Sequence, residues 1–422
     1  MIRVCSNISV LLLSLAIASK ACSREIVVCS TCGVTSIAQA IADSRDGDVI
    51  IVKQGTYKEY DLTVSKKTEL RAEEGAVLDV DRKGQGITVT RDSVKISGLT
   101  VRNVDVNYMN DLSAIKVDYA KDCVIEGNSF EDTFFAIYLA GAGSCRVTGN
   151  RIAGKAKTES SSGNGIHLWK CRELTITDNV ISGHRDGIYL EFVSSSRMER
   201  NHSSQNLRYG LHFMFSDSNS YSENTFERNG AGVAVMYSKF IKMTGNTFKN
   251  NWGESAYGLL LKELYDGILE GNLFYKNTAA IHVEGSNRIE IVRNDFIENG
   301  WALYLLGNSY DNKIIANNFI NNTFDVSSNS SKNNNSYSDN YWDKYKGYDL
   351  NRDGTGDVPY RPVSLFSVIL EKSPESIIML RSVVVDILDA IERVIPSVTP
   401  ETLIDERPKT TRYSNDRDKG AS

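Results

Sequence analysis

Three residues with nitrogen or sulfur donor atoms occupy matched positions in neighbouring segments of the chain. His212 and Met214 lie in "GLHFMFS", and Met236 takes the place of Met214 in the following "GVAVMYS". An imidazole and two thioethers with little carboxylate form a soft ligand set, which suits Cu(I) better than Zn(II), Ca(II) or Mg(II). The alternative is that the two methionines pack under a loop or against a partner and that His212 is an ordinary surface histidine.

A sequence repeat of about 22–23 residues must position these side chains. Its first mark is an Asn followed by one residue and then, in most copies, an apolar one, as in "GNSF", "ENTF" and "GNLF". The marks are Asn128, Asn150, Asn179, Asn201, Asn224, Asn246, Asn272, Asn294, Asn317 and Asn340. This period is typical of one coil of a solenoid. Asn at each corner would bond along the stack and satisfy turn backbone groups.

A second mark lies between the Asn residues and predicts a strand in each coil. A small residue is followed by apolar residues in its first and third positions: Ile115/Val117, Ile137/Leu139, Ile166/Leu168, Ile188/Leu190, Leu211/Phe213, Val233/Val235, Leu259/Leu261, Ile281/Val283 and Leu303/Leu305. Alternation with period two indicates a strand with one buried face. Such strands stack in parallel, so we predict an all-β protein, a right-handed parallel β-helix. A leucine-rich repeat is excluded because its Leu-X-X-Leu-X-Leu frame is absent.

The residues between these apolar positions must point outward in two columns. The first column is Lys116, Tyr138, His167, Tyr189, His212, Ala234, Leu260, His282 and Tyr304; the second is Asp118, Ala140, Trp169, Glu191, Met214, Met236, Lys262, Glu284 and Leu306. Neighbours within a column lie about 4.8 Å apart, and the columns are separated by about 6–7 Å. His212, Met214 and Met236 therefore share one face as a candidate copper site, with His167, two coils away, as a weaker candidate.

The same aromatic-rich face also fits polysaccharide binding or cleavage. "GHRDGIYLEF" brings His184, Arg185, Asp186 and Glu191 into one coil, and such groups serve as acids and bases on sugars. A glycosidase needs two carboxyl groups about 5–9 Å apart. Glu191, however, has Met214 and not a second acid as its column neighbour. A turn held by an Arg–Asp pair is the competing interpretation of "HRDG".

The cysteines divide into three groups. Cys29 and Cys32, in "CSTC", have the spacing of a redox or soft-metal pair, and a short disulfide is an equal alternative in an exported protein. Cys123 and Cys145 take the inward phase and are expected to be core thiols or an inter-coil disulfide. Cys171 follows Trp169 on the outward phase and is an additional ligand candidate.

The ends of the chain differ from the repeat. Residues 1–21 resemble a secretory signal peptide, with lipidation at Cys22 as the alternative. We expect a β-helix over 22–345 with a cap at about 34–55, a loop and C-terminal helices over 346–405 and a disordered tail over 406–422. No other segment is long and apolar enough to cross a membrane. A net charge of −5 gives no indication of nucleic-acid binding.

The segment "DLNRDGTGD" resembles the first half of a calcium loop. Its candidate ligands are Asp349, Asn351, Asp353 and Asp357. The bidentate Glu expected at the twelfth position is replaced by Tyr360. A solvated Asn/Asp turn is the alternative. The helices that follow, split near Pro374, carry enough apolar surface either to cap the solenoid or to dock on another protein.

Taken together, "GNGIHLW", "GHRDGIYLEF", "LRYGLHFMFS", "NGAGVAVMYS", "YGLLLKE" and "NYWDKYKGYDLNRDGTGDVPYRPV" resemble the NosD family. The resemblance is dense from about residue 160 to 405, whereas the first 150 residues resemble only the broader class of carbohydrate-binding and sugar-hydrolase β-helices. It implies a non-enzymatic periplasmic protein that helps deliver copper for the maturation of nitrous oxide reductase.

The resemblance also implies partners. These are the ATPase and the membrane permease of an ABC transporter, a copper chaperone and the reductase itself. A polysaccharide-binding or polysaccharide-cleaving protein is the first alternative function. A scaffold that organises partners without holding metal is the second.

Overall fold

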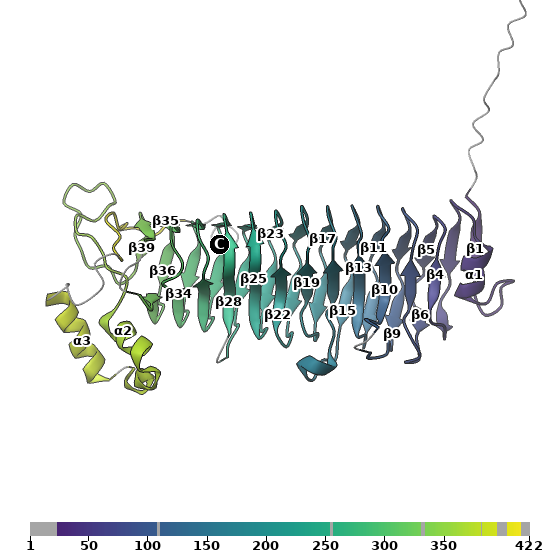
Figure 1. Cartoon of the computed structure of the whole chain (residues 1–422), viewed down its shortest axis with the longest axis horizontal. Coiled ribbons are helices and arrows are strands. Elements are labelled where there is room, and N and C mark those ends of the chain that lie inside the picture. The colour runs from purple at the N-terminus through teal and green to yellow at the C-terminus, as the bar shows by residue number, and fades with distance from the viewer. Residues whose placement is uncertain are drawn as a thin grey trace, which may run out of the picture.

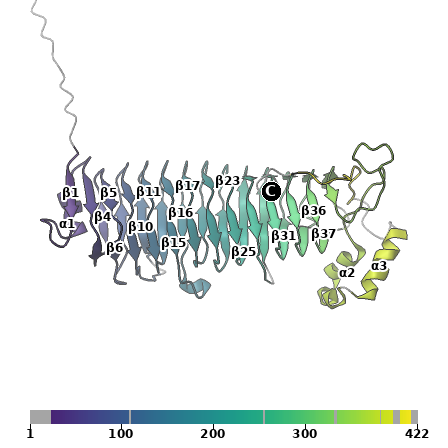
Figure 2. The same ribbon diagram turned by 180° about the vertical axis from the view of Figure 1, so that it is seen from behind.

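Three parallel β-sheets run the length of the molecule and enclose one core (Figures 1 and 2). The computed structural model describes residues 23–107, 110–253, 256–330, 334–380, 382–394 and 403–414. In most coils the chain passes through sheet A, then B, then C before starting the next coil. The predicted all-β parallel β-helix is confirmed. The predicted signal peptide and Cys22 lie outside the described residues.

The strands of each sheet are short, and each pairs with its counterparts in the coils before and after. Sheet A contains β1 (Glu25–Val28), β2 (Val49–Val52), β5 (Glu69–Ala72), β8 (Lys95–Ser97), β11 (Val124–Glu126), β14 (Arg146–Thr148), β17 (Thr175–Thr177), β20 (Arg197–Glu199), β23 (Ser220–Ser222), β26 (Lys242–Thr244), β29 (Ile268–Glu270), β32 (Glu290–Val292), β35 (Lys313–Ile315) and β38 (Ser336–Ser338). Sheet B contains β3 (Gly55–Tyr57), β6 (Ala76–Asp79), β9 (Thr100–Arg102), β12 (Ser129–Glu131), β15 (Arg151–Ala153), β18 (Val180–Ser182), β21 (His202–Ser204), β24 (Thr225–Glu227), β27 (Thr247–Lys249), β30 (Leu273–Tyr275), β33 (Asp295–Ile297), β36 (Asn318–Ile320) and β39 (Tyr341–Trp342). Sheet C contains β4 (Leu62–Val64), β7 (Ile87–Val89), β10 (Ser113–Asp118), β13 (Phe135–Ala140), β16 (Ile166–Trp169), β19 (Ile188–Glu191), β22 (Tyr209–Met214), β25 (Ala231–Lys239), β28 (Tyr257–Tyr265), β31 (Ala279–Glu284), β34 (Trp301–Leu305) and β37 (Phe324–Ser328).

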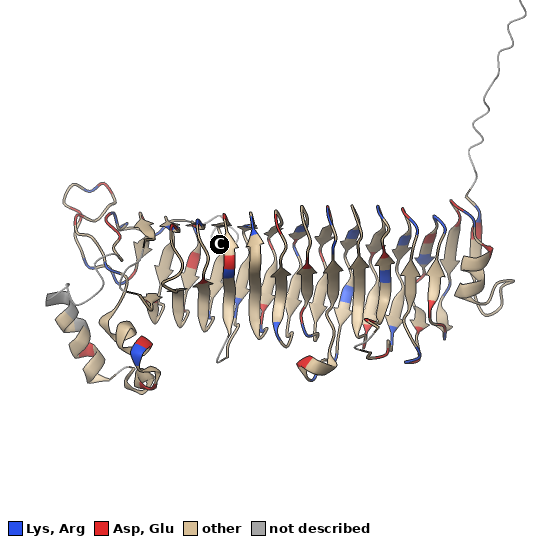
Figure 3. Cartoon of the chain, viewed as in Figure 1, with Lys and Arg blue, Asp and Glu red and all other residues tan. Residues whose placement is uncertain are grey.

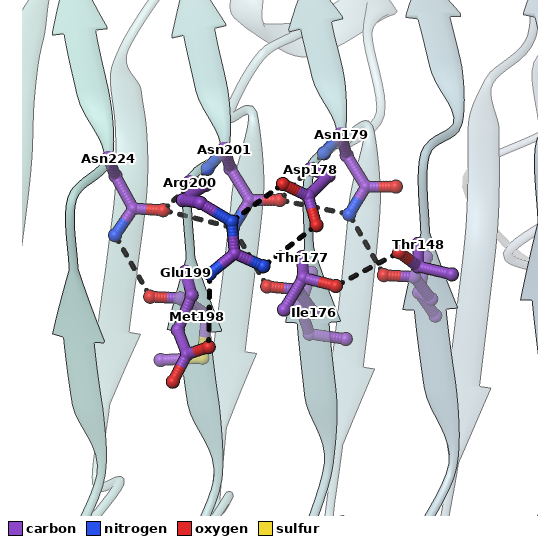
Figure 4. A network of polar contacts seen from close by, with 11 residues as sticks. Thr148, Ile176, Thr177, Asp178, Asn179, Met198, Glu199, Arg200, Asn201 and Asn224 are labelled. Atoms are coloured by element: carbon purple, nitrogen blue, oxygen red, sulfur yellow. Dashed lines mark hydrogen bonds and ion pairs between the residues drawn. The ribbon is translucent and has the colours of Figure 1, made fainter.

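The corner between sheets A and B is built by the predicted Asn repeat. Asn201 is representative: its Oδ1 accepts bonds from the backbone N–H and the Nδ2 of Asn179, at 3.1 and 2.9 Å. Its own Nδ2 donates to Ile176 O at 2.8 Å and to Oδ1 of Asn224 at 3.0 Å (Figure 4). The residue before it, Arg200, has φ +52°, the left-handed conformation that turns the chain sharply. The Asn of each coil therefore accepts the hydrogen bonds that the Asn of the preceding coil donates.

The interior is filled by the residues that the repeat points inward. The apolar pairs predicted for sheet C all belong to the core cluster. A row of aromatic rings runs along sheet B, with the rings of Phe248 and Phe274 stacked at 4.6 Å and those of Phe319 and Trp342 at 4.0 Å. Identical positions in successive coils place like side chains on one another, so the core is continuous along the rod.

The N-terminal end of the solenoid is covered by α1 (Ile37–Asp43), within the predicted cap. Ser36 caps this helix by accepting a bond from Gln39 N. The carboxylate of Glu59 accepts the backbone N–H groups of Ile37 and Ala38, at 2.8 and 2.7 Å. The buried face of the helix closes the open end of the core, which is what a solenoid requires for solubility.

The C-terminal end carries α2 (Leu365–Lys372), η2 (Pro374–Met379) and α3 (Val383–Val394), to the left in Figure 1. Phe366 and Leu370 of α2 are buried and form a small cluster with Phe324 of the last sheet C strand. The loop at 155–163, which lengthens one coil, contains η1 (Glu159–Ser161) and has an exposed tip.

The segment predicted as a disordered tail is ordered over residues 406–414, so that prediction is wrong there. The chain returns to the last coil, where the buried carboxylate of Asp405 accepts bonds from Asn340 N, Asn340 Nδ2 and Trp342 Nε1, at 3.1, 3.0 and 3.0 Å. Asp405 thus takes the place of the next Asn in the ladder. Its charged neighbours in sequence concealed this role.

Candidate functional site

The outward face of sheet C carries the predicted columns in the predicted register. Tyr189 pairs with His212, and Glu191 pairs with Met214. Met214 in turn pairs directly with Met236 on the next strand. The structure therefore places the imidazole and the two thioethers on neighbouring strands of one sheet face.

His212 lies on this outer face yet is almost fully covered. Its flanking residues Leu211 and Phe213 belong to the core, so the imidazole points away from the solenoid interior. The side chains around it leave only 4 % of the residue exposed. Its ring lies between the rings of Tyr189 and Tyr209, at centroid distances of 5.0 and 4.7 Å. The aromatic neighbours shield His212 from solvent.

A buried ion pair supports the ring of His212 from one side. Asp186 is fully buried and forms a two-pronged pair with Arg208 of the next coil, with both N···O distances 3.1 Å. The Nδ1 of His212 lies 3.5 Å from Oδ2 of Asp186 and 3.2 Å from Nη2 of Arg208. Burial raises the pKa of Asp186, but the contact with His212 and the charge of Arg208 outweigh it, so the net pKa is lowered. The carboxylate is therefore ionised.

The other ring nitrogen of His212, Nε2, is buried and has no hydrogen-bond partner among the described residues. An unsatisfied buried polar atom costs about 1–3 kcal/mol, so it needs an explanation. Met214, two residues further on the same outward face, and Met236, its partner on the next strand, are half-buried. In the described part of the chain, this face included, no group of three His, Cys, Asp or Glu side chains could hold a metal. A metal site on this face would therefore depend on methionine sulfur.

A row of exposed aromatic rings borders the two methionines. Phe192, Phe215 and Tyr237 follow Glu191, Met214 and Met236 in sequence, and all three are exposed. Their rings stack on one another at 5.4 and 5.2 Å with nearly parallel planes. The central ring, Phe215, has a neighbour on each face, so the stack offers sugars fewer open ring faces than three separate rings would.

His167, the weaker copper candidate, lies on the same face but apart from the trio. The ring of Tyr189 separates it from His212, at 5.0 Å from each. Its Nδ1 is 3.0 Å from Nδ2 of Asn164. Burial, reinforced by the charge of Arg185, lowers the pKa of His167 to about 3, so the ring is neutral. The structure does not bring it to Met214 and Met236.

The residues considered for sugar chemistry are dispersed. His184 is buried, with its pKa lowered to about 4 by burial, and Glu191 lies on the outer face of sheet C. The lowered pKa of Asp186 is the opposite of what a general acid needs. The Arg–Asp pair expected within the "HRDG" turn is instead made by Asp186 with Arg208, one coil further. No sequence pattern marked Arg208 or the support that it gives to His212.

The cysteines show one error of phase. Cys171 belongs to the buried core cluster, so its prediction as an outward ligand is wrong. Lys170 has φ +51°, and this bend breaks the alternation and turns the next side chain inward. Cys123 and Cys145 are buried free thiols in contact, with Cys123 N donating to Sγ of Cys145 at 3.3 Å. Cys29 and Cys32 form a disulfide.

The calcium-like loop uses its polar side chains on its own backbone. Asp349 accepts bonds from the N–H groups of Asp353 and Gly354, at 3.2 and 2.9 Å. Asp357 accepts a bond from Leu350 N at 2.7 Å, and Asn351 accepts one from Asp353 N at 3.1 Å. These are the bonds of an Asx turn. Calcium binding by this loop stays a prediction.

An apolar helix face stands at the C-terminal end. Val383, Val384, Ile387 and Ile391 of α3 are exposed, and they recur at helical spacing. Ile378 of η2 is also exposed. Lys and Arg alternate with Asp and Glu along the coils, so this apolar face contrasts with the mixed charge of the solenoid (Figure 3). In the described part of the chain no helix has the length and apolar content to span a bilayer.

Comparisons with known proteins agree on one family. Residues 148–347 match the family model described as "Periplasmic copper-binding protein (NosD)". The "Probable ABC transporter binding protein NosD" of Pseudomonas aeruginosa is 30% identical over 368 residues, which cover 82% of this chain and 85% of that protein. The protein of the same name from Stutzerimonas stutzeri is 27% identical over 372 residues, covering 82% and 83%.

Solved structures share the fold at much lower identity. The catalytic unit of an α-1,3-glucanase from Streptomyces thermodiastaticus superposes with a TM-score of 0.58 at 13% identity, covering 72% of this chain and 65% of that one. An exopolygalacturonase from Yersinia enterocolitica gives 0.51 at 9%, covering 75% and 78%. At these identities the likeness concerns the β-helix alone.

Proposed function

Because the chain belongs to the NosD family, we propose that it binds Cu(I) in the periplasm and passes it on within an ABC-transporter assembly, for the maturation of nitrous oxide reductase. The family description and the names of the two relatives support copper binding and association with a transporter. The role is delivery and not catalysis, since copper is the cargo.

The observation that carries the proposal is the buried Nε2 of His212, which has no hydrogen-bond partner among the described residues and belongs to the same sheet face as two thioethers. The guanidinium of Arg208 can only donate, so its contact with Nδ1 at 3.2 Å favours the tautomer with the proton on Nε2, and we propose that copper selects the other tautomer. With the proton on Nδ1 facing the Asp186 carboxylate, the lone pair resides on Nε2 and is available to a metal. A carboxylate behind a metal-binding histidine fixes the ring and raises its basicity. We propose that Met214 and Met236 supply the sulfur donors, with His167 as a weaker neighbour.

This ligand set suits a transient cargo. Thioethers are neutral, so they hold Cu(I) without a change of charge and without the oxidation to which thiols are prone. The half-exposed methionines and the exposed ring ladder leave the site approachable from one side. We propose that a copper chaperone delivers the ion there and that the reductase receives it.

The C-terminal helices supply the contact with the transporter in this proposal. The exposed apolar face of α3 is the kind of surface that marks a protein-interaction site. It suits the membrane permease, whereas the ATPase acts through the permease. Calcium in the loop around Asp353 would steady this end, and we keep it as a separate, minor proposal.

Polysaccharide cleavage is less well supported. The stacked rings of Phe192, Phe215 and Tyr237 offer few open faces to a sugar, and Asp186 is held as a carboxylate by Arg208. Only the fold of distant enzymes favours this alternative.

The test is Cu(I) titration of the mature, disulfide-intact chain under anaerobic conditions against a chromogenic Cu(I) chelator. We expect about one tightly bound ion in the wild type and its loss in the Met214→Leu/Met236→Leu double variant. Met198→Leu/Met243→Leu is the matched control, because both methionines lie in the core. Equal binding by all three proteins would refute the site, and cleavage of uronic-acid polymers would favour the alternative.

A further inference from the structure

The Cys29–Cys32 disulfide differs from the other cysteines of the described chain in its access to solvent. Cys123, Cys145 and Cys171 are only 2, 1 and 2 % exposed and lie in the core. Cys29 and Cys32 are half-buried, and the residues between them, Ser30 and Thr31, are exposed. Among the five cysteines that the structure describes, thiol chemistry with an outside reagent is therefore confined to this pair.

The turn that carries the pair is held independently of the S–S bond. Cys29 N donates to Val34 O, and Cys32 N donates to Cys29 O, both at 3.2 Å. Val28 and Val34 are also paired by a β-bridge. A disulfide between residues only three apart closes a very short loop, and the stabilisation that a disulfide gives increases with loop length. Reduction is thus expected to leave the two sulfur atoms as neighbours in a folded chain.

The surroundings favour a reactive thiolate and leave room for a ligand. The hydroxyl of Thr31 lies 3.5 Å from Sγ of Cys29, where it can donate to a thiolate. Next to Cys32, a Cβ built on Gly33 would meet no atom within 4 Å. A metal ion or the thiol of another protein can therefore approach this turn without displacing the fold.

We propose that Cys29 and Cys32 form a second, redox-controlled Cu(I) site. This inference rests on the proposed function in taking copper as the cargo. A reduced dithiol protein supplies the electrons: one of its thiolates attacks the disulfide to give a mixed disulfide, and its second thiol releases the Cys29–Cys32 dithiol. The two electrons and two protons end on Cys29 and Cys32, and the donor becomes a disulfide. Cu(I) then binds both sulfurs with release of the two protons.

The ligand count selects the metal. Two thiolates on an exposed turn provide two soft donors, whereas structural Zn²⁺ requires four ligands. Within the described residues no further His, Cys, Asp or Glu joins them to complete a larger cluster. A two-coordinate site suits Cu(I). Oxidation removes the site altogether, so copper loading there depends on the redox state.

This site lies at the opposite end of the rod from the C-terminal helices. The pair follows β1, at the purple end of Figure 1, whereas His212 is on β22 in mid-rod. Thiolates hold Cu(I) more firmly than thioethers do, so the turn would retain the ion under conditions in which the mid-rod site releases it. The two sites can be loaded and tested separately.

The experiment compares oxidised and reduced protein without any mutation. The mature chain is reduced anaerobically with dithiothreitol, freed of reductant and titrated with Cu(I) against a chromogenic chelator. We expect reduction to add about one bound copper per chain and to raise the number of thiols that react with a thiol reagent by about two, while the buried ones stay unreactive. The circular dichroism spectrum stays unchanged.

Variants separate this proposal from the mid-rod site. Cys29→Ser/Cys32→Ser is expected to bind the same amount of Cu(I) before and after dithiothreitol. Met214→Leu/Met236→Leu is expected to lose the copper of the oxidised form and keep the copper gained on reduction. The proposal is overturned if the reduced wild type binds no more Cu(I) than the oxidised one, or if reduction unfolds the chain. Loss of the mid-rod copper alone leaves it standing.

Discussion

Two columns built by the same repeat differ in how fully their polar atoms are used. Along the Asn ladder between sheets A and B, each described amide from Asn128 to Asn340 gives and receives hydrogen bonds, and Asp405 closes the last coil. The outward columns of sheet C repeat just as regularly from coil to coil. Nε2 of His212, however, is buried without a hydrogen-bond partner among the described residues. The ladder shows what the repeat does for stability, and the orphaned nitrogen marks a place where stability does not explain the residue.

Breaking the ladder should have the largest effect. Asn201→Ala removes the acceptor for two buried donors of Asn179 and a donor to Ile176 O, so we expect a loss of about 3 kcal/mol or more in the free energy of unfolding. Urea denaturation measures it. The control is Asn110→Ala, at an exposed turn. A loss below about 1 kcal/mol would show that the ladder is not the main support of the corner.

Removing the support of His212 should act on copper more than on the fold. Asp186→Asn replaces the carboxylate behind the ring, and changes of this kind lower metal affinity by about 10–100-fold. Chelator competition with the disulfide-intact chain measures the Cu(I) affinity. Asp178→Asn breaks an Arg–Asp pair on the exposed corner and is the matched control. The same affinity in both variants would contradict the role given to Asp186.

The buried histidines predict a pH dependence of opposite sign to that of an ion-paired histidine. The folded pKa of His167, about 3, lies below the ordinary 6.5, so the unfolded chain takes up a proton that the native ring refuses. Stability therefore falls as pH drops below about 6.5, by up to about 1.4 kcal/mol per pH unit, until the folded pKa is reached. Urea midpoints of wild type and His167→Gln between pH 7 and pH 4 measure it. Parallel curves for the two proteins would refute it.

The exposed ion pairs of the corner should contribute least. Arg200 pairs with Asp178 at 2.8 Å, and both side chains are about half-exposed. Arg200→Ala keeps a Cβ at φ +52°, so the backbone strain is unchanged and only the ion pairs with Asp178 and Glu199 are lost. We expect only a small loss of stability in urea denaturation at 0.15 M salt, because solvent and salt screen exposed ion pairs. A larger loss would show that the ion pairs, and not only the amide ladder, contribute substantially to the stability of the corner.

Sequence periodicity was sufficient for the coils and for the columns. The spacing of the Asn marks and the apolar alternation predicted the strands of sheet C and the side-by-side pairing of Met214 with Met236. Alternation stops at residues with positive φ, such as Lys170, and Cys171 was therefore placed on the wrong face. A second amide ladder, from Asn206 to Asn322, was missed, although each of its members lies five residues after one of the Asn marks and this spacing could have revealed it.

Side-chain contacts between neighbouring coils could not be predicted from the sequence. The sequence suggested that Asp186 forms a local pair with Arg185. Its partner is instead Arg208 of the next coil, 22 positions further along the chain. Asp405 lies in a segment of charged composition, yet it is buried because the last coil needs an acceptor where no further Asn follows. Composition cannot indicate such a need. The requirement for an acceptor becomes apparent only in the folded structure, where the ladder ends at Asn340.

The most direct test of the account is X-ray absorption spectroscopy at the copper edge of the Cu(I)-loaded, disulfide-intact chain. We predict a first shell of one imidazole nitrogen and two sulfur atoms, with the sulfur lost in Met214→Leu/Met236→Leu and the imidazole lost in His212→Gln. A shell of nitrogen and oxygen alone, or one that neither variant alters, would contradict a copper site on the outer face of sheet C.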